Sequence, residues 1–109
     1  MYAEGPQHDE VVRLKGWTLL DFGTDWCGHC QQAAPWVAAL VAASPERGAP
    51  LRHLGVEDGR GKPLGRAFGV KLWPTLVLLH DGIERARVVR PRNGTDLAPL
   101  VAALRADLT

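Results

Sequence analysis

Residues 17–30 read WTLLDFGTDWCGHC, and this stretch decides the fold. Its first part is apolar, aromatic or β-branched apart from Asp21, which predicts a buried strand over residues 17–22. Over residues 27–43 apolar side chains recur four positions apart, which predicts a helix. The two cysteines of the chain therefore lie where a strand gives way to a helix.

Thiol chemistry favours this placement of Cys27 and Cys30. At a helix N-terminus, unpaired backbone N–H groups and the helix dipole stabilise a thiolate at Cys27. Cys30 follows three residues later, close enough to bridge Cys27 once the helix has turned. We expect the first sulfur to be exposed and nucleophilic, and the second to be enclosed and to resolve a mixed disulfide. A CxxC motif at such a junction predicts redox chemistry.

The rest of the chain adds alternating helices and strands around this stretch. Residues 1–7 predict a flexible lead-in, and residues 8–109 predict a single domain. Asp81-Gly82 predicts a two-residue hairpin, whereas strands separated by helices predict parallel pairing. The expected architecture is an α/β fold whose mixed central sheet of about four strands is flanked by helices. The other expected elements are a helix over 8–15, strands over 51–56, 75–80 and 83–89, a helical turn over 63–68, and a helix over 97–108 capped by Thr95 or Asp96, with loops over 44–50 and 57–65.

Composition narrows the classes of function. The 109 residues are 46% hydrophobic, with 13 Lys and Arg against 12 Asp and Glu and a net charge of +1. This balance argues against binding to nucleic acid or to a membrane surface. A chain of this length can form a stable hydrophobic core without disulfides or a bound metal, and two cysteines are too few for a scaffold held together by disulfides. Its apolar runs are too short to span a bilayer, and its first residues lack the pattern of a signal peptide, so we expect a cytoplasmic monomer.

Four features carry a resemblance to a known family. The first is the WCGHC motif itself. Asp21 lies six residues before Cys27, and Pro35, which should kink the helix, lies five residues after Cys30. Residues 73–75 read Trp-Pro-Thr and lead into an expected strand. Each feature alone is weak, but in this order and spacing the chain from about residue 17 to its C-terminus resembles the thioredoxin family.

This resemblance implies a thioredoxin fold and a dithiol–disulfide oxidoreductase. Cys27 would attack a partner disulfide, and Cys30 would release the reduced product as the Cys27–Cys30 disulfide closes. Asp21, buried beneath the second cysteine, would take the proton from Cys30, directly or through water. Pro74, in a cis bond, would leave neighbouring backbone free to pair with a substrate strand. These four residues form the expected catalytic set.

A second expected set binds substrate: Trp26, Gly28, His29, Trp73 and Arg90. Trp26 should shield the disulfide and contact partners. Trp73 should make one wall of the groove in which substrates dock larger and more rigid. The CGHC motif is typical of protein disulfide isomerases, and an imidazole at His29 would stabilise the Cys27 thiolate and make the disulfide easier to reduce. That effect favours an oxidase or isomerase, whereas a cytoplasmic setting would keep the pair reduced and favour a reductase. Alternatively, His29 is a solvated side chain with little effect on the Cys27 thiolate.

Two departures from the family pattern limit what the resemblance implies. Only about 20 residues precede Asp21, so the family's first strand should be short or missing. Four arginines fall between Arg85 and Arg92 with no acid among them. They form either a solvated edge or a cationic groove that selects an acidic partner or glutathione. His53 and His80 are expected to have no part in the chemistry.

The leading hypothesis is a small cytoplasmic protein disulfide reductase. An oxidase or isomerase, and an interaction or co-chaperone module with little redox activity, remain as alternatives. A metal site at Cys27 and Cys30 lacks the further ligands that zinc prefers, so we expect no metal. The chain has no nucleotide-binding glycine motif. A separate thiol or flavoprotein reductase would therefore supply electrons, and the Cys27–Cys30 disulfide would itself be the redox group.

Overall fold

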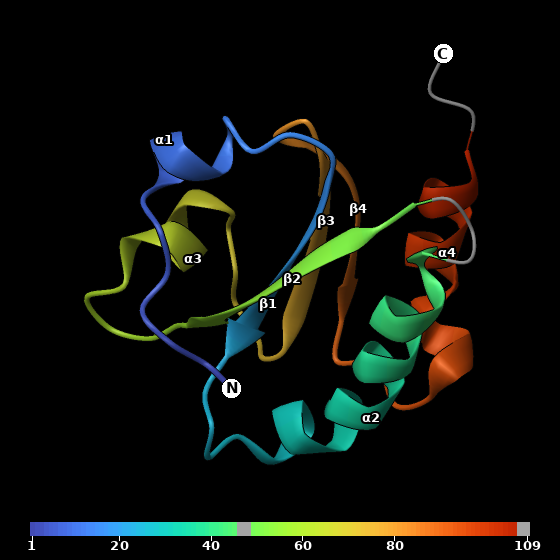
Figure 1. Ribbon diagram of the computed structural model, residues 1–109. Helices are drawn as coiled ribbons and strands as arrows, with labels where there is room; N and C mark the ends of the chain where they lie inside the picture. The colour runs from blue at the N-terminus through green and yellow to red at the C-terminus, as the bar shows by residue number, and fades with distance from the viewer. Residues whose placement is uncertain (46–48, 107–109) are drawn as a thin grey trace.

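Four strands form one mixed sheet in the computed structural model, which describes residues 1–45 and 49–106. Their order across the sheet is β2–β1–β3–β4, with β1 parallel to β2 and the other neighbours antiparallel (Figure 1). The predicted α/β fold with a mixed sheet flanked by helices is confirmed. The strands are β1 (Trp17–Gly23), β2 (Leu51–Glu57), β3 (Thr75–His80) and β4 (Ile83–Val89).

Helices cover both faces of the sheet. One face packs against α2 (Gly28–Ala43) and α4 (Ala98–Arg105), and the other against α1 (His8–Val11) and α3 (Pro63–Ala67), as Figure 1 shows. The inner strands β1 and β3 are buried along their length because both of their faces are covered. None of the helices in the described part of the chain has the length and hydropathy needed to cross a bilayer. The core includes Leu19, Val37, Leu76, Leu78 and Leu100 on the α2 side and Leu20, Phe22, Val56, Val77 and Leu79 on the α1 side.

The predicted hairpin at Asp81-Gly82 joins β3 to β4. Both residues have positive φ angles, 50° and 81°, as a type I′ turn requires. The Asp81 carboxylate also accepts the backbone N–H of Gly16 at 2.7 Å. The hairpin is thereby tied to the connection that leads into β1.

Both terminal helices differ in detail from the sequence prediction. α1 ends at Val11 rather than at residue 15, because the N–H groups of Arg13 and Leu14 bond three residues back, as in a turn. The C-terminal helix α4 has Leu97 as its N-cap rather than Thr95 or Asp96, and it is preceded by a 3₁₀ turn over Gly94–Leu97, which Asn93 caps. Asn93 has the extended backbone of a cap, and its side chain accepts the Asp96 N–H at 3.1 Å. The predicted 44–50 loop and 97–108 helix both extend into residues outside the described ranges.

The N-terminal segment is not the loose lead-in that its composition suggested. Ala3 forms a parallel bridge with Val56 at the outer edge of β2. Its N–H donates to the Gly55 carbonyl at 3.1 Å, and its carbonyl accepts the Glu57 N–H at 2.8 Å. An edge strand has unpaired backbone groups that attract such a segment. This single bridge corresponds to the first strand that we expected to be short or missing.

Candidate active site

The loop after β1 places Cys27 at the start of α2, as the sequence predicted. Cys27 has the extended backbone of an N-cap (φ −79°, ψ 118°), and its Sγ accepts the backbone N–H of Cys30 at 3.2 Å. Both cysteines are thiols in this structure. The sulfur of Cys27 therefore takes the position of a helix-capping acceptor, where the positive end of the helix dipole favours a thiolate.

Cys30 is more enclosed than Cys27. Its exposed fraction is 3%, against 7% for Cys27, so both cysteines are buried and the expectation of an exposed first sulfur is wrong. Burial, with a smaller contribution from the hydrogen bond to Cys27, raises the pKa of the Cys30 thiol to about 11. The Thr24 backbone and the Tyr2 hydroxyl lower the pKa of Cys30 but do not outweigh burial. At neutral pH Cys30 is thus a thiol, which must lose its proton before it can act as a nucleophile.

Asp21 lies on the face of the sheet that α2 covers. The alternation of β1 directs Leu20 and Phe22 to the opposite core and leaves Asp21 on the α2 side, 3% exposed. Its Oδ1 accepts the Tyr2 hydroxyl at 2.8 Å, and its Oδ2 lies 3.0 Å from Nε2 of His53. Asp21 is therefore a buried carboxylate with a partner on each oxygen.

Sequence reasoning missed two of the residues around this carboxylate. His53 was given no chemical role, although β2 was expected to lie parallel to β1, which should have placed it near Asp21. The register pairs His53 with Leu19, two residues from Asp21 and therefore on the same face of the sheet. Tyr2 lies in the segment that we expected to be loose, and no sequence pattern marks its docking. The bridge between Ala3 and Val56 and the hydrogen bond from the Tyr2 N–H to Asp25 hold it at the site.

The predicted loop before β3 also reaches the site. The Trp73–Pro74 bond is cis, and Pro74 is buried, with its carbonyl accepting the Arg90 N–H at 2.9 Å. The Trp73 ring meets Trp26 edge-on, with ring centroids 5.7 Å apart. Trp26 is 74% exposed, so it presents a large apolar face beside the cysteine pair. Gly28 and His29, in the first turn of α2, are exposed as well.

The arginines of β4 and the segment after it do not form one open cationic groove. The Nε of Arg90 donates to the Trp73 carbonyl at 2.8 Å, which ties this side chain to the loop before Pro74. Arg87 makes two hydrogen bonds to Glu84 at 2.8 Å and one to the Phe68 carbonyl at 2.9 Å. Arg87 and Arg90 are therefore engaged in contacts within the protein, so only part of the expected positive charge remains free to bind a partner.

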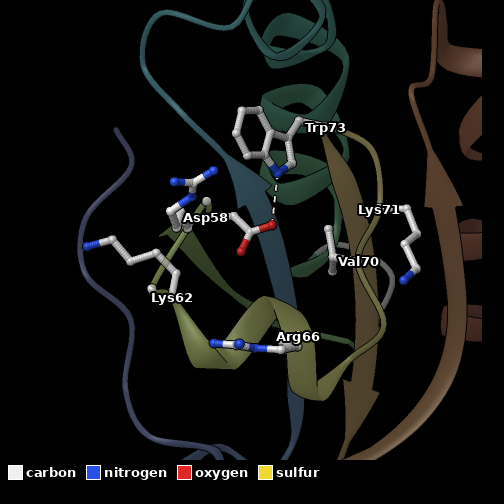
Figure 2. A pocket seen from close by; sticks show the side chains of 9 residues that line it. Asp58, Lys62, Arg66, Val70, Lys71 and Trp73 are labelled. Carbon is white, nitrogen blue, oxygen red and sulfur yellow. Dashed lines mark hydrogen bonds between the residues drawn. The ribbon is translucent and has the colours of Figure 1, made fainter.

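A different cationic hollow lies beside Trp73. It has a volume of about 350 Å³, and its lining includes Asp58, whose carboxylate accepts the Trp73 indole N–H at 2.8 Å (Figure 2). Lys62 pairs with Glu57 at 3.5 Å, whereas the other three cations of the lining have exposed side chains. Sequence reasoning missed this hollow because its residues are spread along a glycine-rich loop and α3. The cations of the lining are Arg60, Lys62, Arg66 and Lys71.

Comparison with known proteins identifies the family. The sequence profile of the Thioredoxin family matches residues 2–103. A thioredoxin from Chlamydia muridarum is 34% identical over 87 residues, which make up 80% of this chain and 81% of that protein. The chain belongs to the thioredoxin family. Together with its CxxC pair, this membership makes residues 2–103 a thiol–disulfide oxidoreductase domain.

Solved structures and longer relatives agree with this membership. Thioredoxin 2 from Pseudomonas aeruginosa PAO1, in its reduced form, is 52% identical, with a TM-score of 0.80 over 95% of this chain and 94% of that one. Protein disulfide isomerase-like 5-3 from Oryza sativa subsp. japonica is 34% identical over 74 residues. This chain spans only 17% of that relative, and 12% of the bovine protein disulfide-isomerase A4 that it also matches. The similarity to these isomerases is therefore to a small part of each.

The raised pKa of Cys30 leads to a prediction about its reactivity. In the Cys27→Ser variant, burial still holds Cys30 as a thiol, so iodoacetamide should modify it at pH 7 about 100-fold more slowly than in the same variant unfolded in urea. The rate in the folded variant should rise as the pH approaches about 11, since the raised pKa delays ionisation. Mass spectrometry of the alkylated chain measures both rates. The Cys30→Ser variant is the control, and equal rates in folded and unfolded Cys27→Ser would contradict the prediction.

Proposed function

We propose that this chain is a small protein disulfide reductase of the cytoplasm. One observation carries the proposal: a helix-capping Cys27 thiol lies beside a buried Cys30 thiol, on the face of the sheet that holds Asp21. Cys27 attacks a substrate disulfide, and Cys30 then attacks Cys27 and releases the reduced substrate. The protein ends the cycle with a Cys27–Cys30 disulfide, which is its own redox group.

The cycle needs a second protein to restore the dithiol. Relatives named thioredoxins support protein disulfides as substrates and a separate thiol or flavoprotein reductase as electron donor. The assignment to the cytoplasm follows from the proposed direction of the reaction. Reducing systems there keep such a pair in the dithiol form, in which it donates electrons.

Reduction of insulin by dithiothreitol tests the activity. We expect the wild-type chain to accelerate the reaction and Cys27→Ser to abolish the acceleration, because it removes the attacking sulfur. Cys30→Ser should accumulate a mixed disulfide between Cys27 and substrate, because no thiol remains to release it. Turbidity follows the first effect and mass spectrometry the second. A wild-type chain without activity would favour an interaction module instead.

A disulfide oxidase or isomerase is the second candidate. Two observations favour it: the exposed His29 in the first turn of α2, and the similarity to protein disulfide isomerases. An imidazole at this position stabilises a thiolate at Cys27 and therefore favours the dithiol over the disulfide. The reduction potential of the pair distinguishes the two candidates. A value near about −270 mV is typical of thioredoxin, and one near about −180 mV of protein disulfide isomerase.

His29→Pro should make the pair more reducing. If the imidazole stabilises the Cys27 thiolate, its loss shifts the potential to a more negative value by about 30 mV or more, which is tenfold in the equilibrium constant. Trp26 fluorescence in graded thiol–disulfide buffers measures the potential. Gln32→Ala, which changes another exposed residue of α2, is the control. An unchanged potential in His29→Pro would mean that His29 is merely solvated.

We also propose that the preferred substrates carry acidic residues near the disulfide. The cationic hollow supports this choice, because it lies beside Trp73, which contacts Trp26 next to Cys27. A substrate held against Pro74 would therefore extend over the exposed side chains of Arg60 and Arg66. Electrostatic attraction of this kind mainly raises the rate of association, and salt screens it. This hollow, rather than the 85–92 segment, is then where an acidic partner or glutathione would bind.

Charge reversal of Arg66 tests the substrate preference. For Arg66→Glu we expect kcat/KM to fall about three- to tenfold on a disulfide peptide with acidic flanking residues, and to change little on a neutral peptide of the same length. The loss should shrink at high salt. Arg105→Glu, at the exposed end of α4, has the same change in net charge and should behave like the wild type. Equal losses on both peptides would contradict the preference.

A further inference from the structure

The N-terminal segment brings a phenol to the buried end of the active site. In Figure 1 the N-terminus lies at the end of the sheet where β1 leads into α2. The bridge between Ala3 and Val56 holds the segment on β2, and the Asp25 carboxylate accepts the Tyr2 N–H at 3.1 Å. Tyr2 is thus anchored on both sides, and its ring lies over the face of the sheet that holds Asp21.

Two glycines, which have no side chains, provide the space that the N-terminal segment occupies. A Cβ on Gly55 would lie 2.6 Å from the Met1 carbonyl oxygen. A Cβ on Gly23 would lie 2.5 Å from Sγ of Cys30 and 3.0 Å from Cζ of Tyr2. Side chains at either position would displace the segment or the thiol. The sheet is therefore shaped so that the Tyr2 ring and the Cys30 sulfur meet above Gly23.

The Tyr2 hydroxyl links Cys30 to Asp21. It donates to Oδ1 of Asp21 at 2.8 Å, and the Tyr2 ring and the Cys30 sulfur lie together above Gly23, where a Cβ would meet both of them. Among the described residues, the Asp21 carboxylate is hydrogen-bonded to Tyr2 and His53, and not directly to Cys30. Burial and the neighbouring Asp21 charge raise the pKa of Tyr2 well above its ordinary value, so the phenol keeps its proton. Such a hydroxyl can accept a proton from one side as it donates its own to the other.

We propose that the Tyr2 hydroxyl carries the Cys30 proton to Asp21 when Cys30 resolves the mixed disulfide. The inference rests on the proposed function and adds a relay residue from outside the CxxC motif. The thiol proton of Cys30 passes to the Tyr2 oxygen as the Tyr2 proton passes to Asp21. The Cys30 thiolate then bonds to the Cys27 sulfur, the bond from Cys27 to substrate breaks, and the substrate leaves as a thiolate that water protonates. Two electrons move from the cysteine pair to the substrate.

His53 extends the relay toward solvent. Its Nε2 is 3.0 Å from the second carboxylate oxygen, and its side chain is 18% exposed against 4% for Asp21. A proton that reaches Asp21 can therefore leave at the edge of the sheet. A competing route is a hollow of about 230 Å³ between the N-terminal segment and α2, through which solvent could reach Cys30. The kinetics of a variant that lacks the Tyr2 hydroxyl distinguish the two routes.

A stopped-flow reaction of the reduced, full-length chain with one equivalent of 5,5′-dithiobis(2-nitrobenzoate) resolves the step. Attack by Cys27 releases the first equivalent of thionitrobenzoate, and attack by Cys30 on the mixed disulfide releases the second. In Tyr2→Phe the ring remains and only the hydroxyl is lost. We expect the first phase to be unchanged and the second to slow at least about tenfold at pH 7. Cys30→Ser, which should show the first phase alone, confirms the assignment.

The pH profile gives a readout that packing alone would not change. The titratable groups next to Tyr2 are Asp21 on β1, Cys30 on α2 and Asp25 in the loop. Beyond them, His53 contacts Asp21, Cys27 contacts Cys30, and the N-terminal amino group pairs with Asp25. The Tyr2 hydroxyl lowers the pKa of Cys30, so its loss should move the midpoint of the second phase to higher pH. At strongly alkaline pH the variant and the wild type should converge, because hydroxide then removes the proton.

A double variant tests whether Tyr2 and Asp21 act in series. Asp21→Asn should slow the second phase by a similar factor, and Tyr2→Phe/Asp21→Asn should be no slower than the slower single variant. Multiplied effects, or a Tyr2→Phe second phase at the wild-type rate across the pH range, would overturn the relay and favour the solvent route. A wild-type chain that fails to reduce insulin while its second phase still depends on Tyr2 would instead contradict only the proposed function.

Discussion

The strand-to-helix junction is the constraint on which the rest of this site depends. Cys27 caps α2 through its sulfur, which accepts the Cys30 N–H at 3.2 Å, and the first turn then directs Cys30 inward. The same helix start thus places one thiol at the helix N-terminus and encloses the other more deeply. Burial protects Cys30 and raises its pKa to about 11, so the fold must also supply a group that takes its proton.

Asp21, which we propose takes this proton, is buried at an energetic cost that its surroundings offset. A carboxylate that is 3% exposed requires hydrogen-bond donors, and the structure provides Tyr2 on one oxygen and His53 on the other. His53 comes from β2, which lies next to β1, and Tyr2 comes from the N-terminal segment, which is bridged to the outer edge of β2. The stability of the buried acid and its capacity to move a proton therefore depend on the same contacts.

The residues at the outer surface of the site come from different segments of the chain than those at its buried end. Trp26 and Trp73 meet edge-on beside the cysteine pair, and Arg90 is tied to the Trp73 carbonyl. The Trp73 indole is fixed in turn by Asp58, within a cationic lining that comes from the loop before α3 and from α3 itself. Recognition can therefore change with these loops while the thiol chemistry, which belongs to β1 and α2, stays the same.

Local pattern determined the elements of this protein: apolar runs predict β1 and β3, Asp81-Gly82 predicts the hairpin, and the CxxC spacing places both thiols. These features depend on neighbours in the sequence, so the sequence alone indicates them. Tyr2, His53 and the cationic hollow depend on contacts across the sheet, which no local period encodes. Ala3 docks because β2 is an edge strand, and Tyr2 fits because Gly23 and Gly55 lack side chains. The sequence by itself therefore determined which sulfur atoms react, whereas the tertiary structure decided which groups surround the proton that must leave.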